Sequence, residues 1–512
     1  MSFFDFHCHT SLKPMFTDEN NRPDCWQPIQ VAIDDILGNI IDSQSALTQL
    51  LDGGTNLACI SLYPLEVSVA NRNLLEWADA LMLNNPNVLS RELLKKIARA
   101  EPGYRYNDLM EKELANLKRV ANNPNNNSQK IKFINTFAEY NAADKNTLHI
   151  ILSVEGGHSF CYGQNEYDDS AQMIANLKKF KSPTSEHRLL YITLVHLEQS
   201  GLANHAYGNK IFDKTPFVPK GDGLTKQGID FIRECYSTKD GEKPVMIDIK
   251  HLSIKSRKQL YDLRRNEFPD MPVLATHSGV TGVSWYARLP IRRYFESRNF
   301  TEIFYDKPQG HIDGTMFNPI SINLYDEDIR EIIQSNGLIG LILDERILGA
   351  GATMLSSEIK PTEKEFISNQ EFDEVVQFEY PHGIPGILRD LIQGELEEIE
   401  TIRAVLNVNR NKVRQTTIHP KYVFNTIVHI HKVGKSVSRK PLDHLCIGSD
   451  FDGLINPVDN CVSADQMHTF SQELVRLFDT YGPQFGIVGD SNELVEGIMF
   501  KNAHRFLGKY FA

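Results

Sequence analysis

Short apolar runs bounded by polar residues recur along this chain, and longer stretches with helical periodicity lie between them. Such runs of Ile, Val, Leu and Phe are typical of buried strands. The sequence predicts eight strands, at residues 2–7, 56–62, 148–154, 189–195, 244–250, 272–276, 338–344 and 444–449. Amphipathic helices are predicted between them, including 36–51, 171–180, 224–235, 255–265 and 326–334. We expect the last helix to have Asp326 as its N-cap and to end at Asn336-Gly337.

The alternation of strands and helices indicates βαβ units and a parallel sheet. Eight strands with right-handed crossovers predict an α/β fold, a (β/α)8 TIM barrel. We expect residues 1–512 to form a single barrel with large, mainly helical insertions in its βα-loops. These insertions cover about 66–147, 289–320 and 346–440, and the first includes the polar loop ANNPNNNSQK.

Several of the apolar runs end on a residue that can bind or serve a metal. In a parallel barrel the carboxyl ends of all strands meet at one mouth, so these end residues converge there. The pattern therefore predicts metal-assisted chemistry without naming a substrate. The runs are FFDFHCH (3–9), HIILSVE (149–155), VMIDIKH (245–251), VLATH (273–277) and LCIGSD (445–450).

Four histidines and one glutamate are the candidate metal ligands. His7 and His9 are two positions apart on a strand, so their side chains point the same way and can share one metal. Glu155 ends a buried strand, where a carboxylate is costly unless it is paired or bound to metal. One oxygen to each of two metals would make it a bridge. His251 and His277 end two successive strands, and neutral imidazole suits zinc.

Other polar residues at the strand ends have roles in catalysis or in structure. Asp450 is the candidate general base or extra ligand, and Asp452 either competes with it or caps the turn. His196 is a candidate to polarise a substrate carbonyl, with a packed histidine as the alternative. Arg288 could pair with a substrate carboxylate through a bidentate fork, or could be an ordinary structural arginine. His158 is interpreted as a supporting or structural residue.

Composition narrows the class of partner. The net charge of −12 argues against a nucleic-acid partner and gives no support to docking on an anionic membrane. No apolar run is long enough to span a bilayer, and no leader is evident, so we expect a cytoplasmic protein with no membrane partner. Its seven cysteines include no CxxC pair, which excludes a cysteine zinc site. GxSxG, phosphate-loop and HExxH motifs are also missing.

Taken together, these residues resemble the membrane (renal) dipeptidase family of binuclear zinc peptidases, within the amidohydrolase-like metal-dependent hydrolase superfamily. The resemblance implies that His7, His9 and Glu155 hold one zinc ion and that Glu155, His251 and His277 hold the other. The matching segments are DFHCHTS, SVEGGHS, YITLVH, GLTKQGIDFIREC, MIDIKHLS, ATHSG, IGSDFDG and EGIMFKNAHRFL.

The resemblance also implies that His196 and Arg288 contact the substrate and that Asp450 handles the proton. Family members commonly have HxD on the first strand. This chain has His9 in the second place, which keeps a ligand but removes one negative charge.

The resulting prediction is a metal-dependent hydrolase that cleaves an amide or peptide bond in a dipeptide or similar small substrate, using a water activated by two divalent metals, zinc by preference. Whether the chain forms a homodimer is left open. One alternative is a phosphoesterase like those of the polymerase-and-histidinol-phosphatase (PHP) family, because DFHCHTS also resembles their opening segment. The other alternative is a barrel without catalytic activity that serves in binding.

Overall fold

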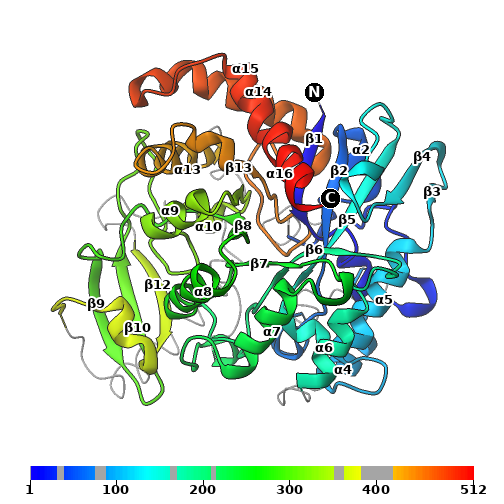
Figure 1. Cartoon of the computed structure of the whole chain (residues 1–512), viewed down its shortest axis with the longest axis horizontal. Helices are drawn as coiled ribbons and strands as arrows, with labels where there is room; N and C mark the ends of the chain where they lie inside the picture. The colour runs from blue at the N-terminus through cyan, green and yellow to red at the C-terminus, as the bar shows by residue number, and fades with distance from the viewer. Residues whose placement is uncertain are drawn as a thin grey trace.

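Eight parallel strands close into a barrel in the computed structural model of this chain (Figure 1). Neighbouring barrel strands follow one another in sequence, and β13 pairs with β1 at Asp5 and Ile447 to close the ring. The predicted (β/α)8 TIM barrel is therefore confirmed. The strands are β1 (Phe3–Cys8), β2 (Thr55–Leu62), β5 (Thr147–Glu155), β6 (Leu189–Thr193), β7 (Met246–Asp248), β8 (Leu274–Ser278), β11 (Leu338–Leu341) and β13 (Leu445–Ile447).

The structure describes residues 2–30, 40–74, 88–161, 170–208, 215–350, 362–381 and 419–512. Each of the eight predicted strands is found within these ranges. The strand predicted at 244–250 is shorter than expected, because only Met246–Asp248 is extended and the chain turns at His251, which has a φ of 67°. This turn places the side chain of His251 at the barrel mouth.

Helices cover the outside of the barrel, as the amphipathic pattern predicts (Figure 1). Four of the predicted segments appear as α6, α7, α8 and α9, and the end of the segment predicted at 36–51 appears as α2. Residues 36–39 of that prediction lie outside the described residues. The helices are α2 (Leu47–Asp52), α6 (Ser170–Lys178), α7 (Lys226–Tyr236), α8 (Ile254–Glu267), α9 (Asp326–Gln334), α13 (His419–Gly434), α14 (Met467–Tyr481), α15 (Ser491–Glu496) and α16 (Asn502–Tyr510).

The start of α9 corrects one prediction. Its N-cap is Tyr325 rather than Asp326, and the Tyr325 N–H donates to Oδ2 of Asp328 at 2.9 Å. Asp326 is the first helical residue, and its Oδ1 lies 2.9 Å from Nε2 of His429. The predicted end is confirmed, because Asn336 takes the left-handed conformation typical of a helix C-terminus, with a φ of 58°.

The long connections contain strands as well as helices. The first forms α4 (Arg91–Ala98), α5 (Tyr106–Lys118) and a hairpin of β3 (Asn122–Asn123) and β4 (Asn126–Phe133). The prediction of a loop at ANNPNNNSQK is therefore wrong over most of its length. β4 also pairs in parallel with β5, and most of its side chains are exposed. Because no face of β4 is fully buried, its sequence lacks the apolar run that indicated the barrel strands.

Three further strands form a separate antiparallel sheet at the left of Figure 1. These are β9 (Ile291–Glu296), β10 (Phe300–Asp306) and β12 (Thr362–Ser368), with β10 in the centre. Buried and half-buried residues alternate along β10. This period of two is typical of a sheet with one covered face, and it differs from the continuous apolar runs of the barrel. The short helices α10 (Glu345–Leu348) and α11 (Phe372–Val375) lie on either side of β12 in sequence.

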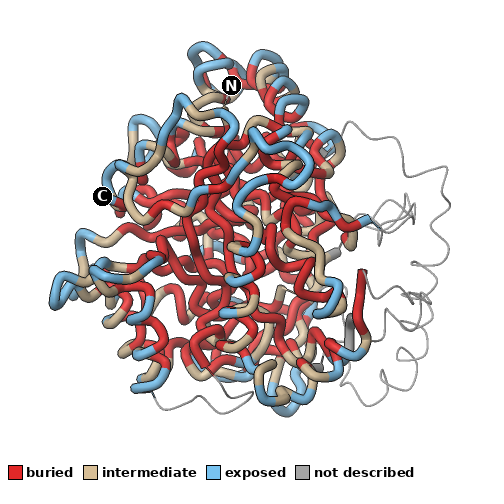
Figure 2. The backbone as a smooth tube through the Cα atoms, turned by 90° about the vertical axis from the view of Figure 1, so that its right-hand side faces the viewer, coloured by how far each residue is buried: buried red, intermediate tan, exposed pale blue. Residues whose placement is uncertain are grey.

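The buried core follows the barrel strands, as Figure 2 shows. All nine residues of β5 are buried, because one face of the strand points into the barrel and the other is covered by helices. Gly340 and Gly448 leave room for the neighbouring strand. A Cβ at either position would lie 1.8 or 1.7 Å from the carbonyl oxygen of Thr276. Only glycine allows β8, β11 and β13 to approach this closely.

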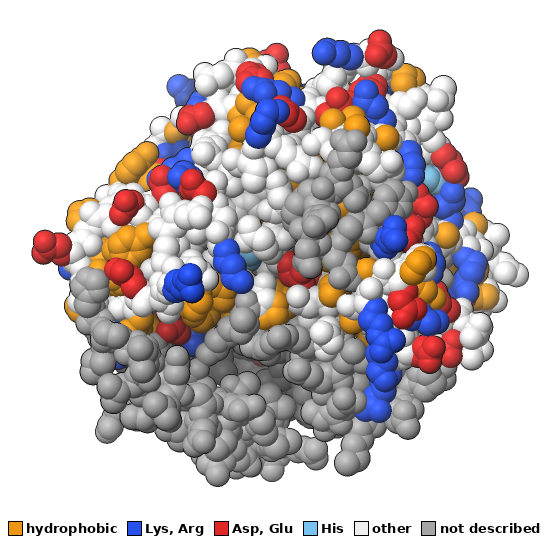
Figure 3. All heavy atoms as spheres, turned by 90° about the horizontal axis from the view of Figure 1, so that it is seen from below, with side chains coloured by type: hydrophobic (Ala, Val, Ile, Leu, Met, Phe, Trp, Pro, Cys, Tyr) orange, Lys and Arg blue, Asp and Glu red, His pale blue; other side chains and the backbone are white. Residues whose placement is uncertain are grey.

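The described surface is that of an ordinary globular protein. Figure 3 shows acidic and basic side chains interspersed on the face seen from below, with apolar side chains scattered between them. Among the helices that the structure describes, none is both long enough and apolar enough to cross a bilayer.

Candidate metal centre

Glu155 stands at the centre of the cluster formed by the strand ends. Its Oε2 lies 2.8 Å from Nε2 of His9 and 3.7 Å from Nε2 of His7. Its Oε1 lies 3.1 Å from Nε2 of His251 and 3.2 Å from Nε2 of His277. All five side chains are buried. Each carboxylate oxygen therefore faces its own pair of histidines.

The spacing within each pair fits a shared metal ion. The Nε2 atoms of His7 and His9 are 3.0 Å apart, and those of His251 and His277 are 3.3 Å apart. Two nitrogens bound at about 2.0–2.1 Å to one tetrahedral zinc lie roughly 3.3 Å apart. Imidazole and carboxylate are also the donor types that zinc and similar divalent metals prefer. The residues present fit two metal positions with Glu155 between them.

Hydrogen bonds behind the cluster aim two of the histidines. Nδ1 of His7 lies 2.8 Å from the hydroxyl of Tyr191 and 3.2 Å from Oγ1 of Thr276. The same Thr276 oxygen lies 3.0 Å from Nδ1 of His277 and donates to Asp248 at 2.5 Å. Because Nδ1 of each ring is engaged on the protein side, Nε2 is directed to the centre. Burial, together with neighbouring cationic groups, holds the pKa of His277 well below its ordinary value, which favours the neutral ligand form.

The backbone is in an uncommon conformation at two of the strand ends. His251 has a φ of 67° and Asp450 has a φ of 61°, both in the left-handed region that residues other than glycine rarely adopt. The turn at Asp450 is fixed by its N–H, which donates to the carbonyl of His7 at 3.0 Å. Such conformations cost free energy and concentrate at functional sites.

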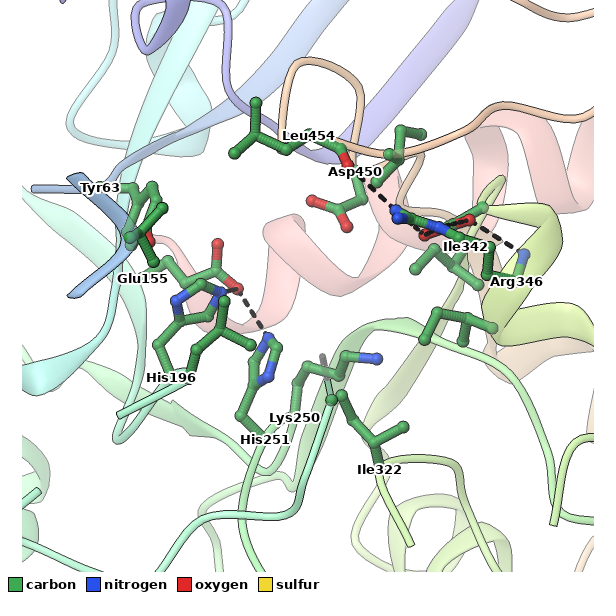
Figure 4. A pocket seen from close by; sticks show the side chains of 17 residues that line it. Tyr63, Glu155, His196, Lys250, His251, Ile322, Ile342, Arg346, Asp450 and Leu454 are labelled. Carbon is green, nitrogen blue, oxygen red and sulfur yellow. Dashed lines mark hydrogen bonds and ion pairs between the residues drawn. The ribbon is translucent and has the colours of Figure 1, made fainter. Parts of the chain in front are cut away.

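Asp450 and Asp452 occupy different environments. Asp450 lines the cavity above the cluster, with Oδ1 3.5 Å from Nε2 of His9 (Figure 4). Burial and the nearby Glu155 raise its pKa above the ordinary value. The carboxylate of Asp452 instead accepts from the N–H groups of Gln44 and Ser45 and pairs with the buried Lys13 at 2.8 Å. Asp452 therefore stabilises the fold, whereas Asp450 faces the cavity.

His196 also lines the cavity, and it has a partner that sequence analysis missed. Its Nδ1 lies 2.7 Å from Oε1 of the buried Glu66, and its Nε2 lies 3.8 Å from Oε1 of Glu155. Burial alone would lower the pKa of His196, but these two carboxylates raise it above the ordinary value. Glu66 follows the second apolar run in the segment ISLYPLE, so the strand-end pattern contained a signal for it.

Two other predicted residues lie elsewhere. Arg288 is exposed, donates to the carbonyl of Glu379 at 3.0 Å, and has its guanidinium over the ring of Tyr380. It is not among the described residues that line the cavity, and its contact with substrate stays a prediction. His158 has Nε2 2.9 Å from the carbonyl of Pro64, which agrees with a structural place.

A cavity lies above the cluster, and its mouth is open to solvent. Figure 4 shows Glu155, His196 and His251 on one side of it and Arg346 on the other. Lys250 and Arg346 are cations in this cavity that the strand-end pattern did not single out. Lys250 is the last residue of the strand predicted at 244–250, and Arg346 follows the strand predicted at 338–344. Their position in sequence was therefore visible, although their orientation was not.

A closed eight-stranded barrel with a histidine and carboxylate cluster at its mouth defines a TIM-barrel metal-dependent hydrolase. Comparison with known families identifies the family within this class. The sequence profile described as Membrane dipeptidase (Peptidase family M19) matches residues 34–288, and the chain belongs to this family. The protein is accordingly a metallopeptidase. Glu155, His196, His251 and His277 fall inside the matched span, whereas His7, His9 and Asp450 lie outside it.

Solved structures are similar to this chain at low sequence identity. The probable dipeptidase PvdM from Pseudomonas aeruginosa is 14% identical with a TM-score of 0.52, over 100% of this chain and 96% of that chain. A metallo peptidase from Rhodobacter sphaeroides, liganded with a phosphinate mimic of the dipeptide L-Ala-D-Ala, is 16% identical with a TM-score of 0.49, over 100% of this chain and 99% of that chain. No curated protein matches this sequence.

Proposed function

We propose that this protein hydrolyses the peptide bond of a dipeptide, or a similar amide in a small molecule, with two divalent metal ions, zinc by preference. The observation that supports this most directly is the position of Glu155, whose two oxygens face two separate pairs of histidines. His7 and His9 would hold one ion with Oε2, and His251 and His277 would hold the other with Oε1. Two such ions, when bound, supply an acidified water and a polarised substrate carbonyl.

Asp450 is the group in this chain that would receive and return a proton. Its carboxylate lines the cavity beside the histidine cluster, where two bound ions would hold the attacking water. Because burial and Glu155 raise its pKa, the carboxylate is a stronger base than an exposed aspartate. The proton taken from the water would pass from Asp450 to the nitrogen of the leaving amine.

His196 would stabilise the negative charge that develops on the carbonyl oxygen. Its Nε2 points toward the cavity while Nδ1 is held by Glu66. The raised pKa of His196 favours the protonated ring, which can donate from both nitrogens at once. A donor fixed in place before the reaction stabilises the transition state without reorganisation.

The function is tested by reconstituting metal-free protein with zinc, manganese or cobalt and assaying a substrate panel. The panel contains L,L and L,D dipeptides, acylated amino acids and phosphomonoesters. We expect metal-dependent hydrolysis of dipeptides and two metal ions per chain by elemental analysis. Hydrolysis of phosphomonoesters without amide hydrolysis would instead favour the PHP-like alternative. Protein that binds no metal and hydrolyses nothing would favour the binding role.

Glu155→Gln is the matched variant for this test. It preserves the shape of the side chain but removes the charge that both histidine pairs face. We expect its metal content to fall below that of the wild type and its activity to fall with it. Glu186→Gln, at a surface carboxylate with 72% side-chain exposure, is the control and should match the wild type in both measurements.

A further inference from the structure

One threonine hydroxyl lies behind both metal positions of the candidate centre. Oγ1 of Thr276, on β8, lies 3.2 Å from Nδ1 of His7 in the first histidine pair and 3.0 Å from Nδ1 of His277 in the second. One oxygen reaches both rings because they stack, with their centroids 4.0 Å apart. All three side chains are buried, so these polar atoms depend on neighbouring side chains rather than on bulk water for their hydrogen bonds.

The proton of the Thr276 hydroxyl is committed to Asp248. Oγ1 donates to Oδ2 of Asp248 at 2.5 Å. Oδ1 of the same carboxylate accepts the N–H of Lys250 at 2.9 Å and the N–H of Thr276 at 3.2 Å. A hydroxyl group has one proton to donate and two lone pairs that accept. Because its proton is used on Asp248, the Thr276 hydroxyl can only accept from the two imidazole rings.

The second oxygen beside His7 has its proton committed in the same way. The hydroxyl of Tyr191 lies 2.8 Å from Nδ1 of His7 and donates to the carbonyl of Phe6 at 2.9 Å. Nδ1 of His7 therefore faces two accepting oxygens, and Nδ1 of His277 faces the accepting oxygen of Thr276. These contacts favour a proton on Nδ1 of both rings.

The same rings present Nε2 to the carboxylate of Glu155. Nε2 of His7 lies 3.7 Å from Oε2, and Nε2 of His277 lies 3.2 Å from Oε1. A neutral ring with its proton on Nδ1 turns a lone pair toward that carboxylate, and two such electron-rich atoms repel unless a cation lies between them. The acceptors behind the rings thus favour the form of both histidines that binds a metal ion.

We propose that Thr276 is a positioning residue shared by the two metal positions, because its hydroxyl, oriented by Asp248, holds one histidine of each pair in the form that binds metal. This inference rests on the proposed two-metal function and adds the residue that joins the two halves of the centre. Loss of such a partner typically weakens metal binding by about 10–100-fold. Tyr191, by contrast, serves the first pair, through His7.

A second interpretation gives Thr276 a role in the fold alone, as the partner of the buried Asp248. The two interpretations differ in what Thr276→Val changes. Valine preserves the shape of the side chain but removes the hydroxyl. A role in the fold predicts a lower melting temperature with unchanged metal affinity. A shared positioning role predicts weaker binding of both ions.

The test measures the zinc dissociation constant in proteins that retain one metal position. His251→Asn leaves the first histidine pair with Glu155, and His9→Asn leaves the second pair with Glu155. Titration against a chromophoric chelator at fixed pH gives the constant in each background. Adding Thr276→Val should raise it by about 10–100-fold in both. Adding Tyr191→Phe should raise it only where the first pair remains.

Two further variants distinguish the hydroxyl from the space that Thr276 fills. Thr276→Ser keeps the hydroxyl and should restore most of the affinity in both backgrounds. Ser278→Ala is the matched control on the same strand. Its Oγ is buried and makes no hydrogen bond within the described part of the chain, so its removal should leave both constants unchanged. If Thr276→Val does not fold, Thr276→Ala removes the same hydroxyl without adding bulk and takes its place.

A dissociation constant that Thr276→Val leaves unchanged in either background would overturn the proposal. So would an equal loss of affinity in Thr276→Ser. Spectra of the zinc-loaded protein give a second readout that a role in the fold would not produce. The Nδ1–H resonances of His7 and His277 should both shift in Thr276→Val, whereas Tyr191→Phe should shift that of His7.

The titrations also separate this inference from the proposed function. If the protein binds two ions but hydrolyses no dipeptide, the proposed function fails, and the dissociation constants still decide the role of Thr276. If it hydrolyses dipeptides and Thr276→Val leaves the constants unchanged, only this inference fails. A wild type that binds no metal would overturn both.

Discussion

The Nδ1 atom of His196 lies 2.7 Å from Oε1 of Glu66, which is 1% exposed. The same glutamate oxygen accepts the N–H of Leu197 at 3.2 Å, and the hydroxyl of Tyr63 donates to its other oxygen. These contacts hold the Glu66 carboxylate in place, so that it can orient the imidazole of His196. Because the charge of Glu66 also favours the protonated ring, we assign it as a positioning residue for His196.

Glu66→Gln should lower kcat by about 10–100-fold, with a smaller change in KM. The pKa of His196 is raised by Glu66, so removing the charge lowers that pKa. If the protonated ring is the active donor, the alkaline limb of the kcat profile then moves to lower pH. Rates measured across the pH range for the wild type and the variant give both effects.

The matched control for Glu66 is Glu198→Gln. Glu198 is a neighbouring carboxylate that accepts the N–H of Ser68 at 2.7 Å instead of contacting His196. An equal loss of kcat in both variants, or an alkaline limb that does not move in Glu66→Gln, would show that Glu66 acts only through the fold.

Asp450→Asn should reduce kcat by about 10²–10⁴, because the amide cannot accept the proton of the attacking water. Metal content should remain near that of the wild type, since the four histidines and Glu155 are intact. Elemental analysis and steady-state rates on the same preparation separate the two effects. A variant with full kcat would remove Asp450 from the proposed reaction.

Asp452→Asn, two residues further on, should affect stability rather than chemistry. It would leave the buried Lys13 ammonium without its anionic partner at 2.8 Å. Breaking a buried pair in this way typically costs about 3–5 kcal/mol. Urea denaturation of the metal-loaded protein measures this loss. A stability equal to that of the wild type would contradict the structural place given to Asp452.

Metal removal should lower both activity and stability. In the absence of ions, four buried histidines face one another around the buried Glu155. A metal that binds only the folded state stabilises it by about 4 kcal/mol per site at a free concentration of 1,000 Kd. Melting curves of chelated and zinc-reconstituted protein should therefore differ, and activity should return with zinc. Identical melting curves would count against a metal site between these residues.

Glu113 should give the protein a pH-dependent stability. Burial raises its pKa to about 7 in the folded protein, although Ser11 donates to Oε1 at 2.7 Å and the N–H of Tyr63 donates to Oε2 at 2.8 Å. The folded state thus holds this proton more tightly than the unfolded state. The stability that protonated Glu113 gives the folded state is fully present below its ordinary pKa of about 4.5. This stability is lost as pH rises through about 7.

Glu113→Gln should remove this dependence. Between pH 4.5 and pH 7, the free energy of unfolding of the variant should rise relative to that of the wild type by on the order of 3 kcal/mol. Urea denaturation at several pH values measures the difference. Glu111→Gln, at an exposed position of the same helix, is the control. A difference between Glu113→Gln and the wild type that stays constant over this range would contradict the assignment.

The barrel was predictable because its strands are buried on both faces. Apolar runs such as the one in β5 stand out in the sequence, and all eight barrel strands were found. The strands β4 and β10 were missed for the opposite reason. One is largely exposed, and the other alternates between buried and half-buried residues within a long connection. Neither contains an uninterrupted apolar run, so local pattern did not distinguish them from loop.

The sequence by itself determined the strands of the barrel and the residues at their ends, because burial in a parallel barrel requires apolar runs and each run has a definite last residue. It therefore indicated His7, His9, Glu155, His251 and His277 as one group. Tertiary structure alone decided which oxygen of Glu155 faces which pair, that Glu66 orients His196, and that Lys250 rather than Arg288 lines the cavity. These relationships join residues far apart in the chain, and their geometry depends on strand register and on the left-handed turns at His251 and Asp450. No local pattern of apolar and polar residues contains that information.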